Sequence, residues 1–177
     1  YIILSESNLP KSWTKGTDAR LVEWQVKNRS TTYEPGSKHH ITQNLTLVAV
    51  WGYDVTYDFG TIGNGVKKTV TEKYNSDIEM PSPNSLVSIP SELPIGYAFV
   101  KWTDGLGNEY GAGADYHVNG PVTFYADWIE SYSIVFHNGT ETLSEIRGYI
   151  DGDVVKLEGS LGSTPMHKDD AGLSEGD

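Results

Sequence analysis

The alternation of apolar and polar residues predicts that this chain is built mainly from β-strands. Residues 53–59 alternate strictly between apolar and polar types, a period of two that is typical of a strand with one buried face. Residues 60–65 contain three glycines and favour a turn. Residues 66–74 are strand-like again, so this part of the sequence predicts a β-hairpin.

The residues that follow predict a small module with one irregular crossover. Residues 80–94 contain four prolines, which allow at most one short helix near residues 84–88. A third strand is expected at 97–102, with Tyr97, Phe99 and, as a further candidate, Val100 facing inward, and a closing strand is expected at 122–128. Four or five strands with one short helix or irregular crossover predict a mostly β or α+β module.

Three aromatic positions recur along the chain and predict an internal repeat of about 77 residues. Trp24 and Trp102 are 78 residues apart, and the residues around them are similar. Trp51 and Trp128 are 77 residues apart, and Tyr33 lies at the same offset from Tyr110. After each closing tryptophan a similar new strand begins, at residues 53–61 and again at 132–140.

The repeat predicts a division of the chain into four parts. Residues 1–51 correspond to the C-terminal half of a repeat, and residues 52–128 form one complete module. Residues 129–158 correspond to the N-terminal half of a further repeat. Residues 159–177 have no periodic apolar face, so a flexible tail or linker is predicted there.

The recurrence of the tryptophans also predicts where the core lies, because core positions repeat with the module. We expect Trp102 and Trp128 to be buried in one core with Tyr97, Phe99, Val55 and Tyr57. Trp13 lies outside the repeat and is the tryptophan left for surface contact. The predicted core residues of the repeats are Trp24, Trp51, Tyr97, Phe99, Trp102 and Trp128.

Charge and composition exclude several classes of protein. The chain has 24 acidic and 13 basic residues and a net charge of −11, which argues against a surface that neutralises nucleic-acid phosphates. It has no cysteine, so neither disulfides nor thiolate metal sites can form. The sequence has no run of about 18 apolar residues for a membrane span, and its first residue, Tyr1, suggests an excised or processed segment.

Two sequence boxes resemble a known family of surface repeats. The first box is residues 96–102, GYAFVKW, and the second is residues 122–128, VTFYADW, which a new strand then follows. This combination is similar to the Listeria–Bacteroides repeat, a family that includes the B-repeat of internalins. Residues 18–21 depart from the first box, and the third copy lacks both tryptophan boxes. The resemblance implies β-grasp-like modules in tandem on a cell-surface protein.

The residues that could carry chemistry do not form a recognised catalytic or metal-binding pattern. His39, His40, His117 and His137 have no second ligand at a diagnostic spacing, so we expect no metal site. The acidic runs 104–109 and 151–153 contain Ca²⁺-type oxygen ligands, but Asp-Gly is also a common tight-turn dipeptide, and the turn interpretation is preferred. No nucleophile–base motif or phosphate loop is present, and we therefore expect neither an enzyme nor a cofactor.

The sequence contains three acceptor sequons for N-glycosylation. They begin at Asn28, Asn44 and Asn138. Because asparagine, serine and threonine are frequent in this chain, some sequons are expected by chance. They identify possible glycosylation sites only if the source glycosylates its surface proteins.

Three functions remain open at this point. The first is an extracellular adhesin stalk or spacer, with neighbouring repeats and a host or cell-surface ligand as partners. The second is a structural subunit of a sheath or filament, completed by strand exchange between like chains. The third is a module that binds a glycan or a protein. Each of the two half-repeats lacks strands. We expect the missing strands to come from flanking sequence, from a contact within the chain or from a neighbouring chain.

Overall fold

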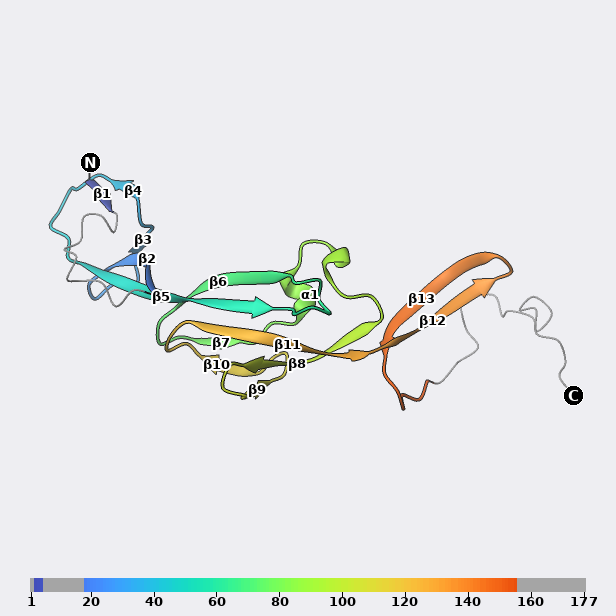
Figure 1. The fold of residues 1–177 in the computed structure, drawn as a ribbon. Coiled ribbons are helices and arrows are strands. Elements are labelled where there is room, and N and C mark those ends of the chain that lie inside the picture. Colours follow the sequence, from blue (N-terminus) through green and yellow to red (C-terminus); the bar gives the residue numbers. More distant parts are fainter. Residues whose placement is uncertain (1, 5–17, 156–177) are drawn as a thin grey trace, which may run out of the picture. The chain divides into compact units, whose positions relative to one another are not determined.

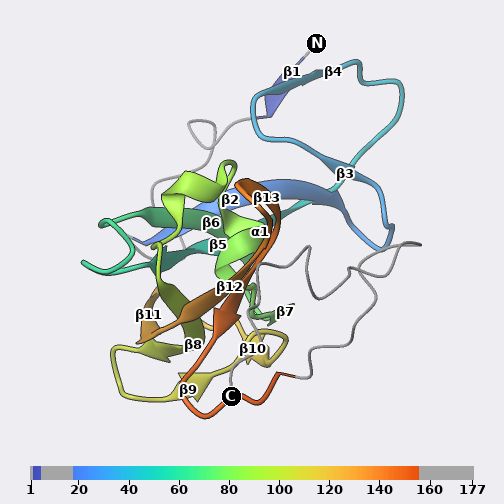
Figure 2. The same cartoon turned by 90° about the vertical axis from the view of Figure 1, so that its right-hand side faces the viewer.

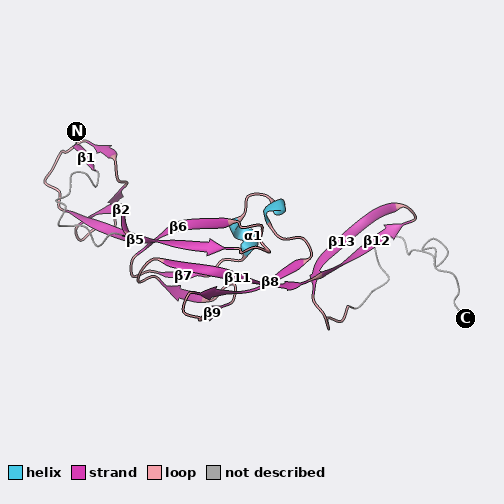
Figure 3. Cartoon of the chain, viewed as in Figure 1, coloured by secondary structure: helices cyan, strands magenta, loops and turns pink. Residues whose placement is uncertain are grey.

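The computed structural model describes residues 2–4 and 18–155, and the fold there is mostly β, as predicted (Figure 3). The predicted flexible tail, residues 159–177, and Trp13 lie outside the described residues. The chain divides into two compact units. Of the described residues, 2–4, 18–93 and 100–127 belong to the first unit, and 94–99 and 128–155 belong to the second.

The first unit contains most of a seven-stranded sheet, together with two short strand pairs. The sheet order is β3-β2-β5-β11-β8-β9, with β6 also paired to β5 (Figure 1, Figure 2). Two antiparallel pairs, β1 with β4 and β7 with β10, lie outside this sheet. The strands are β1 (Ile2–Leu4), β2 (Ala19–Val26), β3 (Thr32–Tyr33), β4 (Ser37–His39), β5 (Leu47–Asp58), β6 (Lys67–Lys73), β7 (Asp77–Glu79), β8 (Tyr97–Asp104), β9 (Glu109–Tyr110), β10 (Asp115–His117) and β11 (Val122–Glu130).

Strand β5 joins the first partial repeat to the complete one. Its 12 residues continue without a break across the repeat boundary predicted between residues 51 and 52. The stretch from Leu47 to Tyr53 pairs antiparallel with β2, and the stretch from Gly52 to Asp58 pairs antiparallel with β6. Near its end, Val55–Asp58 pairs in parallel with Val122–Tyr125 of β11. The predicted hairpin of β5 and β6 is therefore present, and β5 also pairs with two strands distant from it in sequence.

The core of the first unit lies around the alternating residues of β5. Val55, Tyr57 and Phe59 are buried, as the period-two pattern predicts. Trp102 and Phe124 are also fully buried, and their rings contact that of Tyr57 at centroid distances of 5.1 and 5.8 Å. Offset and tilted aromatic pairs of this kind stabilise a core beyond their buried area.

The prediction of one core shared by Trp102, Trp128, Tyr97 and Phe99 is wrong. Phe99 and Trp102 are three residues apart on β8, so their side chains point to opposite faces of the strand. Trp102 is fully buried in the first unit, whereas Phe99 contacts Trp128 in the second unit at a centroid distance of 5.8 Å. Tyr97, which was expected to face inward, lies on the Phe99 face and is 37% exposed, and the further candidate Val100 is 50% exposed.

The proline-rich crossover contains only short helical turns. The helix α1 (Pro83–Leu86) is followed by the 3₁₀ turn η3 (Pro90–Glu92), in agreement with the prediction of at most one short helix. Pro83 occupies the start of α1, where its missing N–H costs no helical hydrogen bond. The crossover is anchored to the core because the Trp102 Nε1–H donates to the Pro81 carbonyl oxygen at 2.7 Å.

The first partial repeat and the complete repeat share the same strand pairs. Trp24 of β2 lies opposite Tyr33 of β3, and Trp102 of β8 lies opposite Tyr110 of β9. The Tyr33 ring contacts that of His39, and the Tyr110 ring contacts that of Tyr116, which lies 77 residues after His39. The sequence offset is thus accompanied by equivalent cross-strand contacts.

The second unit contains an antiparallel hairpin. Strands β12 (Tyr132–Asn138) and β13 (Glu141–Tyr149) are joined by a tight turn in which Gly139 has φ +58°. Most side chains of this hairpin are exposed, including those of Val135, Leu143 and Ile146. Among the described residues, no helix is long and apolar enough to cross a membrane.

Candidate functional site

The repeat tryptophans differ in burial. Trp24 and Trp102 are buried, with exposed fractions of 8% and 0%. Trp51 and Trp128 are half-buried. Trp51 packs at the edge of the cluster formed by Leu21 and Trp24. None of these four rings is fully exposed, and each has part or all of its surface packed against the protein.

The described histidines lie in three separate places of the fold, namely at the end of β4, on β10 and on β12. The His39 ring contacts that of Tyr33 in a tilted arrangement, with 4.3 Å between the ring centroids, whereas His40 is exposed just after β4. His117 Nδ1 lies 2.7 Å from an Asp77 carboxylate oxygen, across the β7–β10 pair. His137 Nδ1 lies 3.3 Å from the Thr142 hydroxyl. Within residues 2–4 and 18–155, no group of three His, Asp or Glu side chains is arranged to hold a metal ion.

The acidic run 104–109 forms a self-contained turn. Asp104 is 8% exposed, and its carboxylate accepts hydrogen bonds from the Leu106 and Asn108 backbone N–H groups, each at 2.9 Å. The Asn108 side-chain amide donates to it at 2.8 Å and holds the pKa of Asp104 below its usual value. The carboxylate thus closes the turn. In the second acidic run, Asp153 similarly accepts from the Ile150 N–H at 2.9 Å.

Asp58 provides a second carboxylate fixed at the end of a strand. Its carboxylate lies 2.8 Å from the Lys67 ammonium, which holds its pKa below the usual value, and it also accepts the Gly60 N–H at 2.9 Å. These contacts connect the end of β5 to the start of β6. Asp58 therefore stabilises the hairpin turn in its ionised form.

We expect the first unit to lose stability in acid. The folded-state pKa values of Asp58 and Asp104 are lowered, so each carboxylate contributes stability that is present above the unfolded-state pKa of about 4. This contribution is lost as the pH falls through the lower folded-state pKa. Urea unfolding between pH 7 and pH 2 should show the decrease, and an Asp58→Asn/Asp104→Asn variant should show a weaker pH dependence. An unchanged slope in that variant would contradict the assignment.

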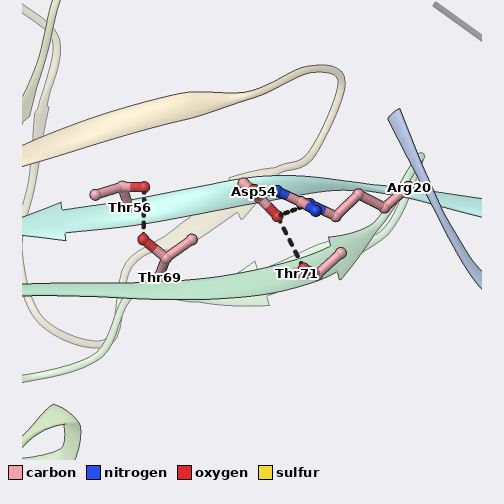
Figure 4. A network of polar contacts seen from close by, with 5 residues as sticks. All are labelled: Arg20, Asp54, Thr56, Thr69 and Thr71. Atoms are coloured by element: carbon pink, nitrogen blue, oxygen red, sulfur yellow. Dashed lines mark hydrogen bonds and ion pairs between the residues drawn. The ribbon is translucent and has the colours of Figure 1, made fainter. Parts of the chain in front are cut away.

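A polar network joins the two repeats of the first unit (Figure 4). The Arg20 guanidinium of β2 donates to both carboxylate oxygens of Asp54 on β5, at 2.7–2.9 Å. The Thr71 hydroxyl of β6 donates to the same carboxylate at 2.9 Å. The bond from Arg20 holds the pKa of Asp54 below its usual value. A parallel ion pair joins Glu23 of β2 to Lys73 of β6 at 2.8 Å. These contacts connect the last half of one repeat to the first hairpin of the next.

The strands at this junction approach closely because Gly52 has no side chain. A Cβ atom at position 52 would overlap the Glu72 carbonyl oxygen of β6 and would lie 2.5 Å from Cγ2 of Val22 on β2. Gly52 pairs with Arg20 on β2 and with Lys73 on β6, so both neighbouring strands contact the same glycine. Sequence reasoning missed this position, although a glycine within a strand pattern is a known signal of close backbone approach.

Removing the Asp54 carboxylate should weaken the junction only slightly. The Arg20 side chain is 64% exposed, and exposed ion pairs contribute about 0.2–1 kcal/mol. We expect Asp54→Ala to lower the free energy of unfolding by about 1 kcal/mol or less. A double-mutant cycle with Arg20→Ala measures the coupling between the two side chains. Additive losses would show that the pair contributes nothing to stability.

The three sequon asparagines are exposed. Asn28 lies in the turn after β2 with φ +62°, and Asn44 lies in the segment before β5. Both line one polar hollow of about 260 Å³. Asn138 ends β12, next to the hairpin turn. A second, more apolar hollow of about 330 Å³ lies beside α1 and is lined by Val87, Ile89 and Leu93 among others.

The fold places this chain in the class of mostly β proteins. No protein-family model, curated protein or solved structure matches the chain. The function must therefore be inferred from the geometry of the chain itself.

Proposed function

We propose that this chain is a non-enzymatic part of the repeat region of an extracellular surface protein, where it acts as a stalk or spacer. The observation that carries the proposal is the equivalence of the two strand pairs, Trp24 with Tyr33 and Trp102 with Tyr110. Equivalent pairs at the sequence offset are what tandem copies of one module produce. Neighbouring repeats are then the main partners of each module, and a cell-surface ligand is a further partner.

The strand order supports a β-grasp-like module. Within the complete repeat, the order is β6-β5-β11-β8-β9, and the first strand, β5, lies parallel to the last strand, β11. The short helix α1 lies in the crossover between β6 and β8. A β-grasp module has this arrangement, with a hairpin, a helical crossover, and first and last strands that are parallel neighbours.

The way in which repeats are joined favours a spacer role. In the first unit, the last strand of one repeat and the first strand of the next are the same strand, β5. A shared strand leaves no flexible linker at the junction, and the Arg20–Asp54 and Glu23–Lys73 pairs add side-chain contacts across it. Modules connected in this way extend along one direction, as in other repeat proteins. The net charge of −11 favours a solvated surface.

Tandem fusions of the chain test the spacer role. One, two and three copies of the full chain, fused in series, should show a maximum dimension in small-angle X-ray scattering that grows by a constant increment. The same series, placed between a cell-surface anchor and a reporter domain, should increase the reach of the reporter in step with copy number. A maximum dimension that grows much more slowly than the copy number, as in a compact cluster, would reject the stalk.

A further inference from the structure

The complete repeat shows how the first strand of a module is covered. Val122–Tyr125 of β11 pair in parallel with Val55–Asp58 of β5. In this paired arrangement Val55, Tyr57 and Phe124 are fully or almost fully buried, with exposed fractions of 0%, 3% and 0%. A first-strand hairpin in this fold therefore completes its core with a parallel last strand.

The hairpin β12–β13 resembles the hairpin β5–β6 in sequence, but no parallel strand pairs with it among the described residues. Ile134 and Phe136 lie 79 residues after Val55 and Tyr57, yet they are only half-buried, and Val135 between them is 42% exposed. Within the part of the chain that the structure describes, β12 hydrogen-bonds to β13 as a two-stranded sheet. The edge of β12 that faces away from β13 is therefore open there.

The first partial repeat has the complementary open edge. Leu45 and Leu47 lie 77 residues before Val122 and Phe124, and they too are only half-buried. Among the described residues, the stretch from Leu47 to Val50 pairs with β2 alone. The chain therefore has both halves of the parallel contact found between β5 and β11.

Neither edge carries the features that normally prevent strand pairing. Residues 41–53 contain no Asp, Glu, Lys or Arg, and neither do residues 131–140. Natural edge strands are commonly protected by charged residues, especially lysine, or by proline. Two uncharged and partly apolar edges with equivalent positions in one module favour pairing with each other.

The geometry points to a strand-acceptor edge on β12 that binds the 45–50 segment of a second copy of this chain in parallel. This inference rests on the proposed repeat organisation. The internal template fixes the register, with Leu45 opposite Ile134, Thr46 opposite Val135 and Leu47 opposite Phe136. Because the two edges belong to different ends of the chain, the contact is heterologous and adds copies head to tail.

Disulfide cross-linking in the cysteine-free chain tests the register. Thr46→Cys and Val135→Cys alter exposed positions equivalent to the observed pair Thr123 and Thr56. When the two single variants are mixed and oxidised, we expect a covalent heterodimer in high yield. The matched control replaces Val135→Cys by Ser133→Cys, which lies about 7 Å further along the strand and outside disulfide reach. An equal yield with Ser133→Cys, or no heterodimer with Val135→Cys, would overturn the proposal.

A charge at the edge tests the association without a cross-link. The mass of the unmodified chain in light scattering should rise above 19.5 kDa as its concentration increases. Val135→Lys should return it to the monomer, because a lysine at the edge opposes strand addition. Leu143→Lys is the control, since Leu143 is similarly exposed at 45% but lies on β13. A monomeric unmodified chain at every concentration would refute the inference.

The double variant Thr46→Cys/Val135→Cys distinguishes pairing within one chain from pairing between chains. Covalent oligomers are expected. A disulfide that forms only within the monomer, independently of concentration, would overturn the second-copy assignment. Failure of these experiments leaves the stalk proposal intact, because the length of the tandem fusions is measured separately.

Discussion

Replacing Trp102 by alanine should lower the free energy of unfolding by about 3–5 kcal/mol. The Trp102 side chain is completely buried and its ring contacts those of Tyr57 and Phe59. The substitution leaves a cavity and also removes the hydrogen bond to the Pro81 carbonyl oxygen. Because small domains have a total stability of about 5–15 kcal/mol, this loss is a large share of the stability of the first unit.

Two matched variants separate the contributions to this loss. Trp128→Ala removes the same side chain from a half-buried position, so it should cost clearly less than Trp102→Ala. Trp102→Phe retains an aromatic ring but loses the N–H donor to Pro81 and should give an intermediate loss. Urea unfolding monitored by circular dichroism measures the loss of stability in all three variants. Equal losses for the two alanine variants would contradict the assignment of Trp102 to the centre of the core.

The elements that sequence reasoning predicted well have local signals. The alternation of residues 53–59 requires only a strand with one buried face, and Val55, Tyr57 and Phe59 are buried as expected. The prolines of residues 80–94 exclude a long helix through their own geometry, and the structure contains only α1 and η3 there. In each case the deciding interaction lies within a few residues of the signal.

Burial on β8 differs from the prediction because its aromatic residues do not share one face of the strand. Tyr97 and Phe99 lie on one face and Trp102 on the other, since residues an odd number apart point in opposite directions. The parity is visible in the sequence. Which of the two faces belongs to the core depends on the neighbouring strands, and that is decided by tertiary pairing.

Long-range pairing could not be read from the sequence. The parallel contact between Val55 and Val122 joins residues far apart in the chain, and many strand orders satisfy the same alternation. The polar network of the junction could not be predicted for the same reason. Arg20 bonds to a residue 34 positions away, and Lys73 bonds to one 50 positions away. Single charged residues on strands give no signal of such partners.

The repeat boundary shows a different limit of prediction from sequence. Sequence similarity divides the chain after Trp51, yet β5 continues through this point from Leu47 to Asp58. A repeat in sequence need not begin where a strand begins. When one strand serves two modules, the unit of sequence duplication and the unit of hydrogen bonding overlap at the junction.

Replacing Gly52 by alanine should disturb this junction, with a loss of about 1–3 kcal/mol. The new methyl group would overlap the Glu72 carbonyl oxygen and crowd Val22, which the register shift between Leu21 and Glu23 leaves without a partner on β5. The Glu72 oxygen belongs to the backbone, so the contact is relieved only if β6 moves away from β5. That movement would strain the hydrogen bonds from Gly52 to Asp58, which the two strands share.

Urea unfolding of Gly52→Ala beside Gly111→Ala measures this effect, because a Cβ atom at position 111 would meet no atom within 4 Å. We expect Gly111→Ala to change stability little. A third variant, Gly52→Ala/Val22→Ala, removes the crowding side chain of β2 but leaves the Glu72 oxygen in place. It should recover only part of the loss, since the closer obstacle is the backbone of β6. A full recovery would assign the tight contact to β2, and equal stability of Gly52→Ala and Gly111→Ala would mean that β5 and β6 separate at the junction without cost.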